Sequence, residues 1–179
     1  MQPADPIDAF VQEWRRERPD LDFSSVEITA RVILLSGLLQ RDWDADAAAN
    51  FDLGGGAFPV LLALRRVGAP FELTPTSLTR EAYLSSGGMT QLLDRLELRG
   101  LVVRRPHPTD RRGLLVQLSP DGVRLADDVL SLRLAKAEAF LAGLSADERE
   151  GLKALLRALV MSLMHQEMDA PSAPNALLS

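Results

Sequence analysis

The sequence contains no cysteine among its 179 residues. That absence excludes disulfide bonds, thiolate metal sites and cysteine-dependent catalysis. Histidine is nearly as scarce, since His107 and His165 are the only two. His165 lies in a C-terminal helical pattern with no metal-ligand partner nearby, which argues against a metal site. We therefore expect the protein to use neither a metal nor another cofactor.

Long apolar runs and the motifs of enzymes are missing as well. No run approaches the roughly 18 apolar residues that a membrane span needs, and the N-terminal segment is too acidic and polar for a signal peptide. We therefore expect a cytoplasmic protein that does not bind membranes. The run Gly54-Gly55-Gly56 lacks the preceding strand and the following lysine of a phosphate-binding loop, and no nucleophile elbow or His–Glu zinc motif is present. We expect no enzymatic activity.

Charge of one sign is unevenly distributed along the chain. The formal net charge is −5, but residues 74–124 contain eight arginines and only five acidic residues, whereas the segments on either side are net acidic. A basic segment within an acidic chain is typical of nucleic-acid binding. With a contrast of this size, a solvated charged surface is an equally good interpretation.

Helical patterns flank the basic segment on both sides. From Asp5 to Arg18, apolar residues recur at i, i+3, i+4 and i+7, which is one stripe of a helix, with Asp5 as its N-cap and Pro6 at its first position. Further helices are expected from Ser24 or Ser25 to about Asn50, over about 58–67, from Ser119 or Pro120 to about Ala142, and over about 146–168, where Ser145 and Glu148 form a capping box.

The basic segment itself changes from helical to strand patterns. The elements expected there are a short strand at 71–73, a helix at 75–81 capped by Thr74, a helix from Ser85 or Ser86 to Arg99, and two strands at 101–105 and 114–118. This order predicts a mostly helical α+β fold: a winged helix-turn-helix lobe at 53–122, carried on a helical dimerisation body formed by 1–52 and 123–168. Residues 169–179 are expected to be a disordered tail.

The second helix of this segment could read DNA bases. Small residues at its start, among them Gly88, allow close approach to a phosphate or a base edge, and the free N–H groups of a helix start favour phosphate. Thr90 and Gln91 then face the major groove, where glutamine can pair with adenine. A solvent-facing polar surface with a glycine-weakened start is the alternative interpretation.

The loop between the two strands is rich in arginine. The basic side chains of this expected wing are Arg104, Arg105, His107, Arg111 and Arg112. Arginine at a hairpin tip suits a narrow minor groove or the phosphates beside it. Asp110 is expected to orient one of the arginines and fix the loop, and His107 is expected to be an ordinary loop residue.

These residues resemble the multiple-antibiotic-resistance regulator (MarR) family of bacterial transcription factors. The resemblance is carried by LLDRLELRGLVVRR at 92–105, by Asp110-Arg111-Arg112-Gly113, and by the exit LSPDG at 118–122. It implies a homodimer whose first and last helices interlock, a palindromic double-stranded DNA operator, and Asp110 as the residue that orders the wing. The DNA contacts expected on this basis are Ser85, Ser86, Gly88, Thr90, Gln91, Arg95, Arg105, Arg111 and Arg112.

The N-terminal helix resembles the urate-responsive branch of the same family. Trp14 and Arg66 match two of that branch's ligand-binding residues, while Pro59 and Leu92 occupy the positions of the other two. Trp14 could instead be a packing residue. We expect a regulator, more consistent with a repressor, that responds to a small anionic or aromatic molecule. Pro59 and Leu92 speak against urate as that molecule, and a regulator without an effector is the alternative. A winged-helix protein-interaction module without DNA binding is the alternative function.

Overall fold

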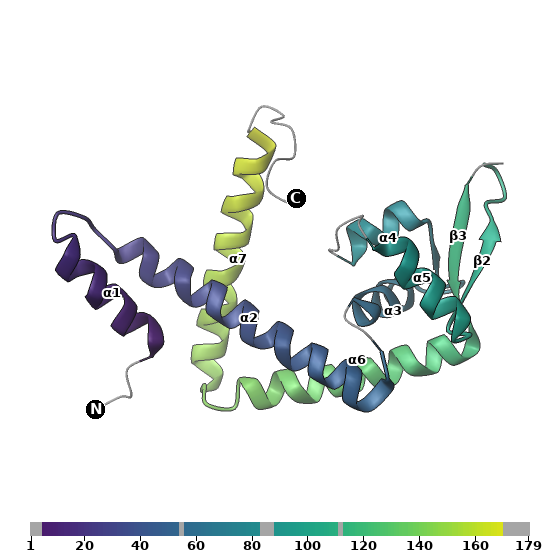
Figure 1. Ribbon diagram of the computed structural model, residues 1–179, viewed down its shortest axis with the longest axis horizontal. Helices are drawn as coiled ribbons and strands as arrows, with labels where there is room; N and C mark the ends of the chain where they lie inside the picture. Colours follow the sequence, from purple (N-terminus) through teal and green to yellow (C-terminus); the bar gives the residue numbers. More distant parts are fainter. Residues whose placement is uncertain (1–4, 54–55, 83–87, 111–112, 170–179) are drawn as a thin grey trace. The chain divides into compact units, whose positions relative to one another are not determined.

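The computed structural model describes residues 5–53, 56–82, 88–110 and 113–169 (Figure 1). Contacts divide the chain into two compact units, residues 1–130 and 131–179, which are considered separately below. The elements are mostly helices with one small sheet, so the predicted α+β class is confirmed. No helix in the described part of the chain combines the length and apolar character that crossing a membrane requires.

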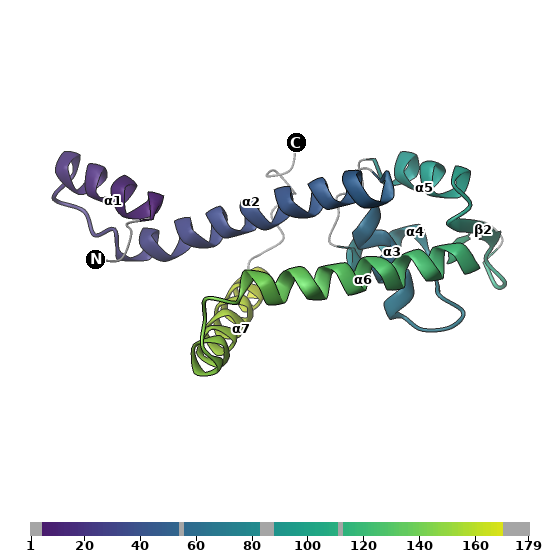
Figure 2. The same ribbon diagram turned by 90° about the horizontal axis from the view of Figure 1, so that it is seen from below.

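The first unit begins with two helices that are tied together by ion pairs. Helix α1 (Pro6–Glu17) has Asp5 as its N-cap, as predicted, and it lies beside the first half of α2 (Ser24–Phe51) (Figure 2). Arg31 on α2 donates to Asp5 at 2.8 Å and also to Asp8. The hydrogen bond from Arg31 lowers the pKa of the Asp5 carboxyl below its ordinary value. The cap of α1 is therefore also its anchor to α2.

Three short helices and the sheet form the core of the first unit. These are α3 (Ala57–Arg66), α4 (Pro75–Glu81) and α5 (Met89–Leu98), and they gather around the base of the strands (Figure 1). Thr74 caps α4 and Pro75 occupies its first position, as predicted. The largest fully buried side chains of this core are Leu61, Leu64, Leu78, Leu93, Leu96, Val60, Val102, Val116 and Val129. Because each helix contributes at least one of them, the three helices form one packed lobe.

The sheet has three antiparallel strands in the order β1-β3-β2. They are β1 (Glu72–Leu73), β2 (Val102–Pro106) and β3 (Leu114–Leu118), and they lie within a residue of their predicted positions. In the β2–β3 hairpin, which we call the wing, Arg104 pairs with Val116 and Arg105 with Leu115. The predicted winged helix-turn-helix fold is thus confirmed.

The LSPDG exit from the wing has a structural explanation. Ser119 Oγ donates to the carbonyl of Gly100 at 2.6 Å and accepts from the backbone N–H of Gly122 at 3.0 Å, which caps α6 (Pro120–Phe140). A Cβ on Gly122 would lie 1.9 Å from the carbonyl oxygen of Leu101. Only glycine fits there, so these residues hold the start of α6 against the segment that follows α5.

The second unit contains the remainder of α6 and the whole of α7 (Ala146–Asp169). The predicted capping box is present, because Ser145 N–H donates to Glu148 at 2.8 Å and Glu148 N–H donates back to Ser145 Oγ at 3.3 Å. Arg149 pairs with Glu138 at 2.8 Å and so links the two helices of the unit. Asp169 is the last residue of α7, and the rest of the predicted tail, 170–179, lies outside the described residues.

Candidate nucleic-acid interface

Helix α5 occupies the position of a recognition helix, but it starts later than predicted. Its N-cap is Gly88, with φ of 85°, and its first residue is Met89, so the prediction that Ser85 or Ser86 caps it is wrong. A left-handed backbone is accessible to glycine at little steric cost, which is why Gly88 can take the cap position. Among the described residues, no side chain caps this helix start, and the N–H groups of a helix start favour phosphate. Ser85 and Ser86 lie outside the described residues.

Helix α5 has one buried side and one exposed side. Met89, Leu92, Leu93 and Leu96 are buried in the lobe. The exposed side chains are Thr90, Gln91, Asp94, Arg95 and Leu98. Three of the predicted DNA contacts, Thr90, Gln91 and Arg95, therefore lie on solvent-accessible turns of one helix. Leu92 belongs to the core, so this position packs the lobe and does not project a polar group.

A network of hydrogen bonds closes the tip of the wing. His107 N–H donates to the carbonyl of Gly113 at 3.0 Å, and Gly113 N–H donates to the carbonyl of Asp110 at 2.9 Å. His107 Nδ1 accepts from the backbone N–H of Asp110 at 3.2 Å. The structure places His107 in the loop, as predicted, and its ring accepts a hydrogen bond from the loop backbone. Arg111 and Arg112 lie outside the described residues.

The two adjacent arginines of β2 have different surroundings. Arg104 is 22% exposed in its side chain and lies toward α5, where it pairs with Asp94 at 2.6 Å and with Glu97 at 2.8 Å. Arg105 is exposed and follows on the opposite face of the strand, as the alternation of side chains requires. Only Arg105 of this pair is therefore open to a ligand on the wing.

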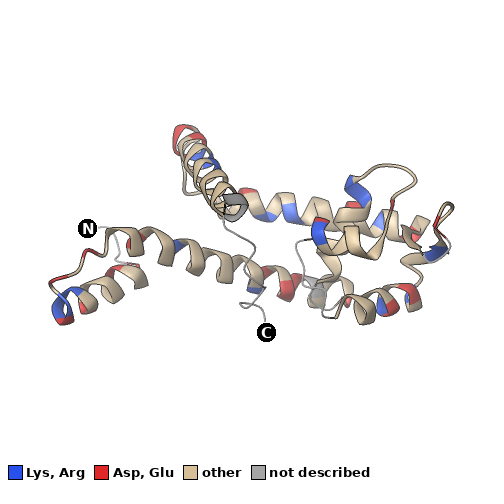
Figure 3. Ribbon diagram, turned by 90° about the horizontal axis from the view of Figure 1, so that it is seen from above, with Lys and Arg blue, Asp and Glu red and all other residues tan. Residues whose placement is uncertain are grey.

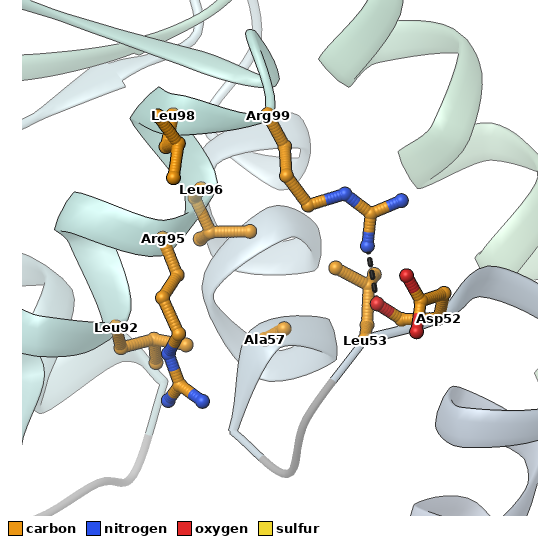
Figure 4. Close-up of a pocket in the computed structure, with 8 residues that line it drawn as sticks. All are labelled: Asp52, Leu53, Ala57, Leu92, Arg95, Leu96, Leu98 and Arg99. Carbon is orange, nitrogen blue, oxygen red and sulfur yellow. Dashed lines mark hydrogen bonds between the residues drawn. The ribbon is translucent and has the colours of Figure 1, made fainter.

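A cavity of about 250 Å³ lies beside α5 (Figure 4). Its apolar lining is Leu53, Ala57, Leu92, Leu96 and Leu98, and its polar lining is Asp52, Arg95 and Arg99. Arg99 donates to the backbone carbonyls of Phe51, at 3.0 Å, and of Asp52. The cavity therefore adjoins both α5 and the end of α2.

The two predicted effector residues are held by neighbours of their own. Arg66 donates to Glu81 at 2.6 Å and thereby lowers the pKa of that carboxyl. Trp14 lies 6.4 Å from Phe23, ring centroid to ring centroid, and is half exposed. An anion that binds Arg66 would therefore share its guanidinium with the Glu81 carboxylate.

A helix-turn-helix beside a β-hairpin defines a winged-helix fold, and exposed polar side chains on its second helix are typical of DNA-binding members. Comparison with known proteins identifies the particular group. The sequence pattern of the MarR family matches residues 51–113. The multiple antibiotic resistance protein MarR of Escherichia coli is 32% identical over 110 residues, which are 61% of this chain and 74% of MarR. The chain belongs to the MarR family of transcriptional regulators.

Two further similarities extend over most of the chain. The HTH-type transcriptional regulator PecS of Dickeya dadantii is 32% identical over 150 residues, or 84% of this chain and 90% of PecS. The crystal structure of a cysteine-to-serine variant of E. coli MarR with operator DNA superposes with a TM-score of 0.63 at 27% identity, covering 76% of this chain and 96% of MarR. The protein is thus a DNA-binding transcriptional regulator and not an enzyme.

Proposed function

We propose that the protein binds a palindromic operator as a homodimer and represses transcription until a small molecule releases it. The observation that carries this proposal is the exposed polar face of α5, beside a hairpin whose tip is rich in arginine. The N-terminal turns of the two recognition helices enter successive major grooves, about 34 Å apart. The contacts predicted from the sequence are retained as part of this proposal, and the site of action is the cytoplasm.

Exposed apolar side chains support the homodimer. On α2 these include Ile28, Val32, Ile33, Leu35 and Leu38, and on α7 they include Leu152, Leu155, Leu156, Val160 and Leu163. Ile33 and Leu155 are each 72% exposed, which is unusual for such large apolar groups in rows along a helix. A second copy of the chain would cover these rows, in line with the interlocking helices that the family resemblance implies.

The effector we propose is a small anionic or aromatic molecule other than urate. The cavity beside α5 supports this, because its apolar lining could hold a ring and Arg95 or Arg99 could meet a negative charge. Trp14 and Arg66 form the second candidate site. The Glu81 carboxylate next to Arg66, together with Pro59 and Leu92 at the other two positions, disfavours urate there.

DNA binding by the purified protein tests the proposed function. We expect a footprint on a palindrome in its own upstream region, with an affinity that falls steeply as salt rises. Gln91→Ala should lower discrimination at particular base pairs by about 1–3 kcal/mol each, measured over a panel of single-base operator variants. Binding that is insensitive to salt would contradict the proposed phosphate contacts, and a partner protein captured without any DNA binding would favour the protein-interaction module.

Thermal-shift screening tests the effector. Carboxylates, purines and phenolic compounds would each be added with and without operator DNA, and a ligand at 100 times its Kd should stabilise the free protein by about 2.7 kcal/mol. The same compound should release DNA, since the two binding equilibria are linked. Loss of the response in Trp14→Ala and Arg66→Ala would place the ligand at the second candidate site, and loss in Arg99→Ala would place it in the cavity beside α5. Arg16→Ala, which changes α1 beside Trp14, is the control and should respond normally.

A further inference from the structure

Arg104 joins the wing to the recognition helix through three separate groups of α5. Its guanidinium pairs with Asp94 and Glu97, and one of its nitrogens lies 3.4 Å from the carbonyl of Thr90. Its backbone N–H also donates to Glu97 Oε1 at 3.1 Å. Glu97 therefore holds both the main chain and the side chain of one strand residue, and this fixes where the wing leaves the helix.

The same pairs affect the charge of the DNA-facing surface. Acidic and basic positions are interleaved along the ribbon of the lobe (Figure 3), and Asp94 lies one turn beyond the exposed residues Thr90 and Gln91. A carboxylate at this position would repel the phosphates that the helix must approach. Arg104 offsets that repulsion, because it places its positive charge 2.6 Å from Asp94 and 2.8 Å from Glu97.

Arg104 is poorly placed to bind DNA directly. Its side chain is 22% exposed, and both terminal nitrogens are engaged by α5. Arg105, its neighbour in sequence, is exposed on the other face of β2. The two arginines therefore differ in role although they are adjacent in sequence and identical in type.

We propose that Arg104 is a positioning residue for DNA binding, which neutralises the two carboxylates of the recognition helix and sets the wing against that helix. This inference rests on the proposed DNA-binding mode of α5. The inference requires that the loss of operator affinity caused by replacing Arg104 depends on the charges of Asp94 and Glu97.

A double-mutant cycle tests this dependence. Arg104→Gln in the otherwise native dimer should lower operator affinity about tenfold or more, which lies within the coupling expected for groups in one ion-pair network. In a background carrying Asp94→Asn and Glu97→Gln, the same Arg104→Gln change should lower operator affinity by about threefold or less. Arg105→Gln is the matched control and should lower operator affinity by the same factor in both backgrounds. Thermal unfolding followed by circular dichroism would verify that every variant is folded at the assay temperature.

The outcomes separate this inference from the proposed function. If Arg104 contacted a phosphate itself, Arg104→Gln would lower operator affinity by the same factor in both backgrounds and would reduce the salt slope by about one in each. That result would overturn this inference but not the proposed function. If the native protein bound no operator in the same assay, the proposed function and this inference would both fall. A large loss in the native background that nearly disappears in the neutralised one is the result we expect.

Discussion

Replacing Leu156 and Leu163 on α7 by aspartate should convert the protein to a monomer and remove most of its affinity for the operator. Leu156 and Leu163 are seven residues apart on one face of the helix, and their side chains are 44% and 53% exposed in the single chain. Replacing both by Asp places charge where the second copy should bury apolar surface, and burial of an unpaired charge is strongly unfavourable. Analytical ultracentrifugation should then report a monomer at concentrations where the native protein is a dimer.

The DNA affinity should fall with the dimer, because each monomer retains only one half-site contact. Linking two half-site contacts contributes on the order of 10²–10⁴ in affinity, so fluorescence anisotropy with a full palindrome should show a loss of that size. Arg157→Glu changes the net charge by the same −2 on another face of α7 and is the control, for which we expect a dimer. A double variant that remains dimeric would exclude this face of α7 from the interface.

Local signals in the sequence were sufficient for the elements that have side-chain caps. Thr74 and Pro75 mark the start of α4, and Ser145 with Glu148 marks the start of α7, as the structure confirms. Each signal involves residues within one helical turn, so no distant contact is needed to interpret it. The start of α5 was misplaced because Gly88 carries no side-chain signal, while two nearby serines are better cap residues by type.

Residues whose roles depend on tertiary contacts could not be assigned in this way. Arg104 and Arg105 look equivalent in sequence, and strand periodicity says only that they face opposite sides. Which of them meets α5 depends on how the hairpin packs against the helix that carries Asp94 and Glu97. Glu81, fifteen residues from Arg66, likewise showed no sign of being its partner. The cavity beside α5 is lined from two segments about 40 residues apart, so no local pattern predicts it.

The tip of the wing should supply a large and sequence-independent part of the affinity. Arg111 and Arg112 are the predicted contacts there, and Asp110 and Gly113, which flank them in sequence, are hydrogen bonded to each other. A hydrogen bond to a charged group contributes about 1.5–3 kcal/mol, so Arg111→Ala with Arg112→Ala should weaken operator binding by about 10²-fold or more. Random-sequence DNA should be affected by a similar factor, since phosphate contacts carry no base information.

The salt dependence of binding distinguishes local contacts from net charge. Each phosphate contact contributes about 0.9 to the slope of log affinity against log salt, so the double wing variant should lose about two. The control is Arg15→Ala with Arg16→Ala, which also removes two positive charges, but from α1. For this variant we expect an unchanged salt slope and at most a small loss of affinity. Equal losses in the two double variants would mean that the wing arginines act only through the overall charge of the protein. Loss of discrimination between bases in the wing variant would instead place an arginine in the minor groove, where it reads groove width as well as phosphate.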